Sequence, residues 1–177
     1  MTTASKITII RILLIPLFMA AALLEWQLTA LTIFVLAGVT DWVDGYIARR
    51  YNQITNFGKF MDPLADKLLV TAALLIFVQW GRMEAWVLMV VLTREFVISG
   101  LRMMAAASGK VIAAGWSGKV KTIITMLGIV VMLTTFHDRV VIWDFTMDNI
   151  AVAAILVTTL YSGAEYLLKN YKVFVDA

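Results

Sequence analysis

The chain has 177 residues, of which 62% are hydrophobic and 15% are charged, and its formal net charge is +3. Soluble domains are typically about 45–50% apolar and about 25% charged, so this composition predicts an integral membrane protein. The sequence contains no cysteine, which excludes disulfides, thiolate metal sites and cysteine nucleophiles.

Six apolar stretches follow one another along the chain, each about long enough to cross a bilayer as a helix. They cover residues 7–24, 28–48, 62–80, 85–106, 119–136 and 148–168. No clear small-residue cleavage site follows the first, so we expect a retained helix rather than a signal peptide. Pro63 follows Asp62, a pair typical of a helix start. We predict an all-α integral membrane protein with six transmembrane helices in a single domain, residues 1–177.

Lysine and arginine gather on one side of this topology. With the N-terminus in the cytoplasm, only Arg82 and Arg139 fall in loops on the opposite side, and Arg94 and Arg102 fall within the fourth stretch. Because cytoplasmic loops carry the excess of positive charge, we predict that both termini are cytoplasmic, together with the connection between the second and third helices. The basic residues are explained by this topology, so nucleic-acid binding has no support.

Four aspartates stand where the second stretch ends and the third begins. Asp41 and Asp44 are three apart, and Asp62 and Asp66 are four apart, so each pair lies on one face of its helix. A short connection makes these helices antiparallel neighbours, whose faces then border a polar cavity on the cytoplasmic side. Carboxylates near hydrocarbon are costly and repel one another without a cation. We therefore predict a divalent metal site, and Mg²⁺ or Mn²⁺ has the fitting preference for oxygen ligands.

The residues that follow Asp44 suit a phosphorylated ligand. Gly45 and Ala48 share the aspartate face and have little side-chain bulk, so a ligand can approach the helix backbone. Arg49 comes directly after them and can hold a phosphate or pyrophosphate through two hydrogen bonds. A competing interpretation is a proton or cation relay in a transporter, because acids within membranes also mark ion pathways.

The aspartates belong to a longer pattern, which reads Asp41-x2-Asp44-Gly45-x2-Ala48-Arg49-x8-Gly58-x3-Asp62-x3-Asp66. This pattern resembles the signature of the CDP-alcohol phosphotransferase family at all eight of its fixed positions. The resemblance implies a membrane enzyme with six transmembrane helices, usually a homodimer, in which an alcohol displaces CMP from a CDP-linked donor with two divalent metal ions. It also implies the cytoplasmic (inner) membrane of a bacterium, with the active site facing the cytoplasm.

The resemblance also implies roles, position by position. Asp41, Asp44 and Asp62 correspond to metal ligands, and Asp66 corresponds to the general base and is expected among the ligands as well. The residues expected to contact the CDP part of the donor are Gly45, Ala48, Arg49 and Thr55.

A cationic group near the cytoplasmic face indicates which alcohol is accepted. Its members are Arg94, Arg102, Lys119 and Lys121. A small acceptor that carries its own phosphate suits such a group, so we predict that these residues bind the acceptor phosphate. The runs around them, Thr93–Phe96, Ser99–Arg102 and Gly118–Thr122, resemble the bacterial branch of the family that transfers from CDP-diacylglycerol to glycerol 3-phosphate.

Other interpretations stay open. The same chemistry can use inositol phosphate, serine or a phospholipid as the acceptor. Lys119 and Lys121 can be topological anchors or contacts to lipid headgroups, and Glu95 or another acid can be a structural partner of Arg94. Rivals of a different class are a metal- or proton-coupled transporter and a noncatalytic scaffold whose aspartates bind a structural cation.

Overall fold

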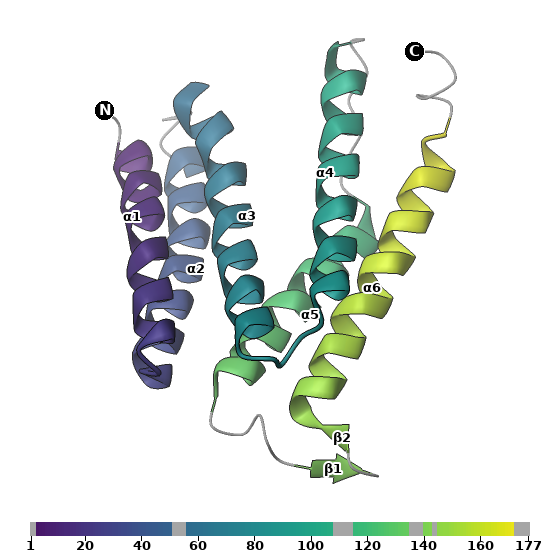
Figure 1. The fold of residues 1–177 in the computed structure, drawn as a ribbon. Helices are drawn as coiled ribbons and strands as arrows, with labels where there is room; N and C mark the ends of the chain where they lie inside the picture. Colours follow the sequence, from purple (N-terminus) through teal and green to yellow (C-terminus); the bar gives the residue numbers. More distant parts are fainter. Residues whose placement is uncertain (1–2, 51–55, 108–114, 135–139, 143–144, 172–177) are drawn as a thin grey trace. The chain divides into compact units, whose positions relative to one another are not determined.

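The computed structural model describes residues 3–50, 56–107, 115–134, 140–142 and 145–171. For residues 3–7, 41–50, 56–60, 62–63, 107, 140–142 and 145 this description covers the backbone only. In chain order the elements are α1 (Thr3–Leu23), α2 (Gln27–Arg50), α3 (Asn56–Gln79), α4 (Ala85–Ala107), α5 (Trp116–Leu133), β1 (Val140–Ile142), β2 (Phe145–Thr146) and α6 (Met147–Lys169) (Figure 1).

The elements divide into two compact units. The first contains α1, α2 and α3 together with residues 133–135, and the second contains residues 81–132 and 136–177. Six helices in the described part of the chain confirm the all-α, six-helix prediction. An antiparallel pair of very short strands, β1 and β2, precedes α6 and was not predicted, because two or three residues carry no detectable alternation.

In the first unit α1 packs against both α2 and α3, and α2 also contacts α3. The three helices alternate in direction along the chain (Figure 1). Phe18 of α1 meets Phe34 of α2 with the ring centroids 5.9 Å apart, and Ala22, Ala30 and Ala37 are buried beside them. Because lipid is as apolar as these side chains, close packing of small residues is what holds helices together in a membrane.

Glu25 sets the turn between α1 and α2, with a φ of 60°. Its N–H donates to the carbonyl of Ala22, and the N–H of Trp26 donates to the carbonyl of Ala21, both at 3.0 Å. These two bonds form the Schellman arrangement, in which the left-handed residue is usually glycine. A glutamate therefore occupies a backbone conformation that its Cβ disfavours.

In the second unit α4 packs against α6, and β2 contacts α6. The hydroxyl of Thr146 accepts a hydrogen bond from the N–H of Asn149 at 3.3 Å and so caps the first turn of α6. A Cβ at Gly128 of α5 would lie only 2.9 Å from Cδ1 of Ile155 in α6. Glycine at this position therefore permits α5 and α6 to approach each other closely.

Large apolar side chains lie outside in both units, while polar ones lie inside. Leu28 is 77% exposed and Leu168 is 75% exposed, whereas Arg11 and Thr159 are completely buried. A soluble protein rarely exposes so much apolar surface, so the surface is consistent with contact to lipid. Among the described residues, α5 and α6 are long and apolar enough to cross a bilayer, and α1 and α2 contain shorter apolar segments. That all six helices cross the membrane stays a prediction.

One predicted helix boundary was wrong. The structure begins α3 at Asn56, so Asp62 and Pro63 lie inside the helix rather than at its start. Hydropathy marks only the apolar part of a helix, whereas backbone hydrogen bonding continues through the polar residues before it. Pro63 is the eighth residue of α3, so its missing N–H leaves one backbone carbonyl of the preceding turn without its usual donor, which membrane helices tolerate where other groups satisfy that carbonyl.

Candidate active site

The backbone brings the two aspartate pairs toward one end of the first unit. Asp41 and Asp44 lie in the last three turns of α2, and Asp62 and Asp66 lie in the first three turns of α3. The two helices contact each other and run in opposite directions (Figure 1). The arrangement of these helix ends is therefore the one that the predicted metal cavity requires.

The side chains of the motif are described only in part. Asp66 is half-buried, while the side chains of Asp41, Asp44 and Asp62 lie outside the described residues. Among the side chains that the structure describes, no group of three His, Cys, Asp or Glu is placed to hold a metal ion. Because three of the four motif carboxylates are not among them, the metal site stays a prediction.

For the residues predicted to contact CDP, too, the structure describes at most the backbone. The backbone of Gly45, Ala48 and Arg49 forms the last turns of α2, between Asp44 and the helix end. Their side chains lie outside the described residues, and so does the whole of Thr55.

A buried polar cluster joins the three helices of the second unit. Oε1 of Glu95 in α4 accepts from Nη1 of Arg94 at 2.9 Å and from Nζ of Lys121 in α5 at 2.8 Å. Nη2 of Arg94 also donates to the hydroxyl of Ser162 in α6 at 2.6 Å. The side chain of Arg94 is 13% exposed and that of Lys121 is 5% exposed. The side chain of Glu95 is 23% exposed, so two cations share one partly buried carboxylate.

Two glycines make room for the arginine of this cluster. A Cβ at Gly118 of α5 would lie 3.5 Å from Nη2 of Arg94, and a Cβ at Gly163 of α6 would lie 3.2 Å from Cγ of Arg94. The first distance is an ordinary contact, whereas the second is tighter, so a side chain at Gly163 would require the stem of Arg94 to shift slightly. Glycine at position 163 therefore lets the Arg94 stem lie close to α6.

The other two predicted cations lie at the surface. Arg102 is exposed, and its Nε donates to the hydroxyl of Tyr166 at 3.3 Å. Lys119 is exposed too, with Nζ 5.4 Å from the ring centroid of Trp116. The four cations therefore form an inner pair, Arg94 and Lys121, and an outer pair, Arg102 and Lys119. Whether any of them binds an acceptor phosphate stays a prediction.

Polar residues of α6 were missed at the sequence level. Thr159, Ser162 and Tyr166 are all buried, and with Ile155 they form one stripe of α6. The signal was available, because positions three and four apart share a helix face. However, the hydroxyl groups of Thr158 and Tyr161 lie on other faces of the same helix, so this spacing alone did not distinguish the buried stripe.

A model of the CDP-alcohol phosphatidyltransferase family matches residues 1–161 of this chain. A Bacillus subtilis (strain 168) protein named CDP-diacylglycerol–glycerol-3-phosphate 3-phosphatidyltransferase is 41% identical over 95% of this chain and 94% of its own length. Proteins of the same name from Haemophilus influenzae and Sodalis glossinidius are 40% and 39% identical, each over 91% of this chain and 89% and 90% of their own lengths.

The family model and the names of these relatives indicate a transferase of substituted phosphate groups, and six helices with an apolar exposed surface are consistent with a membrane protein. The chain belongs to the CDP-alcohol phosphatidyltransferase family. The resemblance predicted from the eight motif positions is thereby confirmed.

Proposed function

We propose that this chain transfers the phosphatidyl group of CDP-diacylglycerol to glycerol 3-phosphate and releases CMP, which makes phosphatidylglycerophosphate in phospholipid biosynthesis. The observation that carries the proposal is the extent of the similarity to relatives named for this reaction. They are 37–41% identical to it over 91–95% of the chain. The runs around Arg94 and Lys121, which resemble the glycerol 3-phosphate branch, support the same acceptor.

Asp41, Asp44, Asp62 and Asp66 are the residues that would hold two divalent ions, Mg²⁺ or Mn²⁺. The donor set fits, because it consists entirely of carboxylates and the backbone carries both pairs to one end of a helix pair. Such ions, when bound, offset the charge of the diphosphate and stabilise the leaving CMP.

The chain's own groups then carry out the transfer. Asp66 accepts the proton of the acceptor hydroxyl as the oxygen attacks the phosphorus that bears the lipid, and the bond from that phosphorus to the CMP oxygen breaks. A carboxylate is a weak base near neutral pH, so alignment of the two substrates supplies much of the rate. The proposed contacts to the CDP moiety are Gly45, Ala48, Arg49 and Thr55.

The second unit supplies the proposed site for the acceptor's phosphate. Arg94 and Lys121 carry two positive charges against the one negative charge of Glu95, so the cluster keeps a net attraction for an anion. Arg102 and Lys119 lie at the surface, where they raise the local concentration of an anionic acceptor.

The proposed setting of this chemistry is the cytoplasmic (inner) membrane of a bacterium. All six helices cross it as a single domain, residues 1–177, with both termini and the active site on the cytoplasmic side, and the enzyme is a homodimer. The distribution of lysine and arginine supports the orientation, and the exposed leucines support the membrane contact.

An acceptor panel tests the function. Purified protein in detergent micelles receives CDP-diacylglycerol and Mg²⁺ or Mn²⁺, and CMP is measured with glycerol 3-phosphate, inositol phosphate, serine or a phospholipid as the added alcohol. We expect CMP only with glycerol 3-phosphate and only with the metal ion. CMP release with a different alcohol would identify that alcohol as the acceptor in place of glycerol 3-phosphate. Ion uptake by vesicles without CMP release would favour a transporter.

A further inference from the structure

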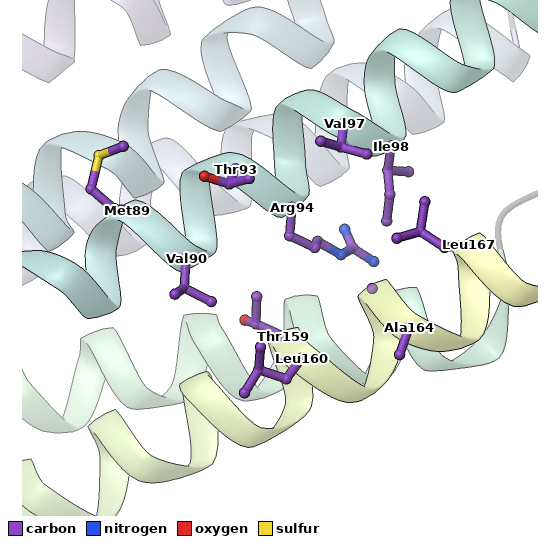
Figure 2. Close-up of a pocket in the computed structure, with 11 residues that line it drawn as sticks. Met89, Val90, Thr93, Arg94, Val97, Ile98, Thr159, Leu160, Ala164 and Leu167 are labelled. Atoms are coloured by element: carbon purple, nitrogen blue, oxygen red, sulfur yellow. The ribbon is translucent and has the colours of Figure 1, made fainter. Parts of the chain in front are cut away.

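A groove of about 450 Å³ lies between α4 and α6 (Figure 2). Apolar side chains make up most of its lining, among them Met89 and Val97 of α4 and Leu160 and Leu167 of α6. Along α4 the lining extends from Met89 to Ile98, which is about 13 Å at the rise of an α-helix. The groove therefore has the length and character to hold a hydrocarbon chain.

Two residues that line the groove, Arg94 and Thr159, also carry polar atoms that are buried within the protein. Thr159 is completely buried, and neither its Oγ1 nor Nε of Arg94 has a hydrogen-bond partner among the described residues. Figure 2 shows Arg94 reaching from α4 toward α6, with Thr159 on the facing helix. Buried polar atoms are usually hydrogen-bonded, and these two belong to residues that line the groove, so a ligand bound there would be able to satisfy them. Both can donate a hydrogen bond, and the ligand must therefore offer an oxygen acceptor.

The occupant enters from the bilayer. Met89 and Leu160, which line the groove, are 60% and 54% exposed, and Phe96 on α4 is 68% exposed. Such a rim faces hydrocarbon rather than water. A molecule that brings an apolar chain and an ester oxygen along this route is a diacyl lipid.

Arg94 indicates which lipid. Its terminal nitrogens belong to the polar cluster with Glu95 and Ser162, and Arg94 is also one of the residues that line the groove. The reaction joins the acceptor to the phosphorus that bears the lipid, so the glycerol of the lipid donor must lie close to the acceptor. Because Arg94 belongs to both the polar cluster and the groove lining, it is placed to serve both. The donor is also anionic, which complements the excess positive charge of the cluster.

We propose that the groove between α4 and α6 binds one acyl chain of CDP-diacylglycerol, with the ester carbonyl of that chain accepting hydrogen bonds from Arg94 Nε and Thr159 Oγ1. The proposal rests on the proposed function in taking CDP-diacylglycerol as the donor. It adds a residue, Thr159, and a place on the protein for the lipid half of the substrate.

A pair of matched substitutions tests whether the Thr159 hydroxyl group contacts the donor. Thr159→Val removes it with little change of shape, and Thr125→Val does the same at another buried threonine whose Oγ1 also lacks a partner among the described residues but which does not line the groove. We expect Thr159→Val to raise the KM for CDP-diacylglycerol roughly three- to tenfold, the loss of one hydrogen bond, and to leave the KM for glycerol 3-phosphate unchanged. Equal shifts in both variants would overturn the assignment.

Filling the groove tests the acyl chain. Val90 lines the groove on α4, whereas Val157 is 63% exposed on α6 and does not line it. We expect Val90→Trp to lower kcat/KM at least tenfold for a long-chain donor and less than twofold for a dihexanoyl donor, and Val157→Trp to change neither. Equal losses with both donors would overturn the proposal, and the threonine pair tests it independently if Val90→Trp does not fold.

Photolabelling identifies the occupant directly. CDP-diacylglycerol with a diazirine in one acyl chain is activated on the purified wild-type protein without any acceptor, and adducts are mapped by mass spectrometry. We expect adducts on α4 and α6 that excess unlabelled CDP-diacylglycerol removes and excess phosphatidylethanolamine does not. Equal competition would mean that any membrane lipid fills the groove, and absence of adducts would mean that something else, such as a second copy of the chain, covers it; either result overturns the proposal.

Labelling needs no turnover, so the two proposals fail separately. An acceptor panel that selects a different alcohol would overturn the proposed function and leave the labelling pattern as it is. An active enzyme without adducts in the groove would overturn the proposed acyl-chain site and leave the proposed function as it is.

Discussion

Glu95 keeps two cations together inside the second unit. Its Oε1 accepts from both Arg94 and Lys121, so the side chain that the sequence suggested as a structural partner of Arg94 has that role in the structure. This pairing does not compete with a role in anion binding. One carboxylate cannot neutralise two cations, and the remaining charge sits in an interior where it acts strongly on a nearby phosphate.

Replacing the Glu95 carboxylate distinguishes its structural role from the proposed role of the cluster in anion binding. Glu95→Gln leaves Arg94 and Lys121 without their counter-charge, so we expect a loss of about 1–3 kcal/mol in stability, seen as a lower Tm in micelles. Glycerol 3-phosphate or inorganic phosphate should raise the Tm of the variant more than that of the wild type, because the anion replaces the missing charge. Glu84→Gln, at an exposed position, is the control and should change neither. A variant that phosphate does not stabilise would speak against anion binding at this cluster.

Asp66 carries the proposed proton transfer. Asp66→Asn keeps the shape of the side chain and removes its basicity, so we expect kcat for CMP release to fall by about 10²–10⁴-fold. Photolabelling by the diazirine donor should persist, because the lipid half of the donor is held elsewhere. Turnover at the wild-type rate would remove Asp66 from the role of general base.

Among the helices, the end of α1 carries a local strain that can be relieved. Glu25 adopts a φ of 60° in the turn to α2. Glu25→Gly should therefore stabilise the protein by about 0.5–1 kcal/mol, measured as a higher Tm. Gly81 has a φ of 70°, and although nothing lies within 4 Å of a Cβ built there, Gly81→Ala should lower the Tm for the same backbone reason. An unchanged or lower Tm for Glu25→Gly would contradict this account of the turn.

The sequence pattern predicted where the helices lie more accurately than it predicted which residues share a helix face. The six apolar stretches predict all six described helices to within a few residues except at the start of α3, where the helix continues through a segment that mixes apolar residues with Asn56, Gly58 and Lys59. Lys119 and Lys121 were placed in one group although they are two apart, and a spacing of two turns side chains toward nearly opposite sides of a helix. The structure accordingly exposes Lys119 and buries Lys121.

The two parts of the candidate site also differ in how well the sequence predicted them. The aspartate motif is local in sequence, so its spacing alone predicted the chemistry that family membership supports. The members of the polar cluster around Arg94 come from three helices, and Ser162 lies 68 residues away from Arg94 along the chain. Only packing brings such residues together, and neither hydropathy nor charge counting contains that information.

At the scale of the whole molecule, the orientation in the membrane can be measured cleanly because the chain has no cysteine. We expect a single cysteine at Ser108 to be protected from a membrane-impermeant thiol reagent in intact cells. A single cysteine at His137 should react under the same conditions, since the positive-inside rule places it on the opposite side. The reverse result would invert the proposed topology and move the aspartate motif away from the cytoplasm.

Arg94 occupies the border between a polar cluster and an apolar groove, and this has a thermodynamic consequence. A ligand that draws the guanidinium toward Ser162 and Glu95 changes what Nε offers to the groove, and the converse also holds. Binding energies that pass through one side chain are coupled, and the coupling is reciprocal. If both sites are filled as proposed, each substrate will alter the Kd of the other by the same factor, and Arg94→Lys, which lacks the planar fork, will abolish that cooperativity before it abolishes either binding event.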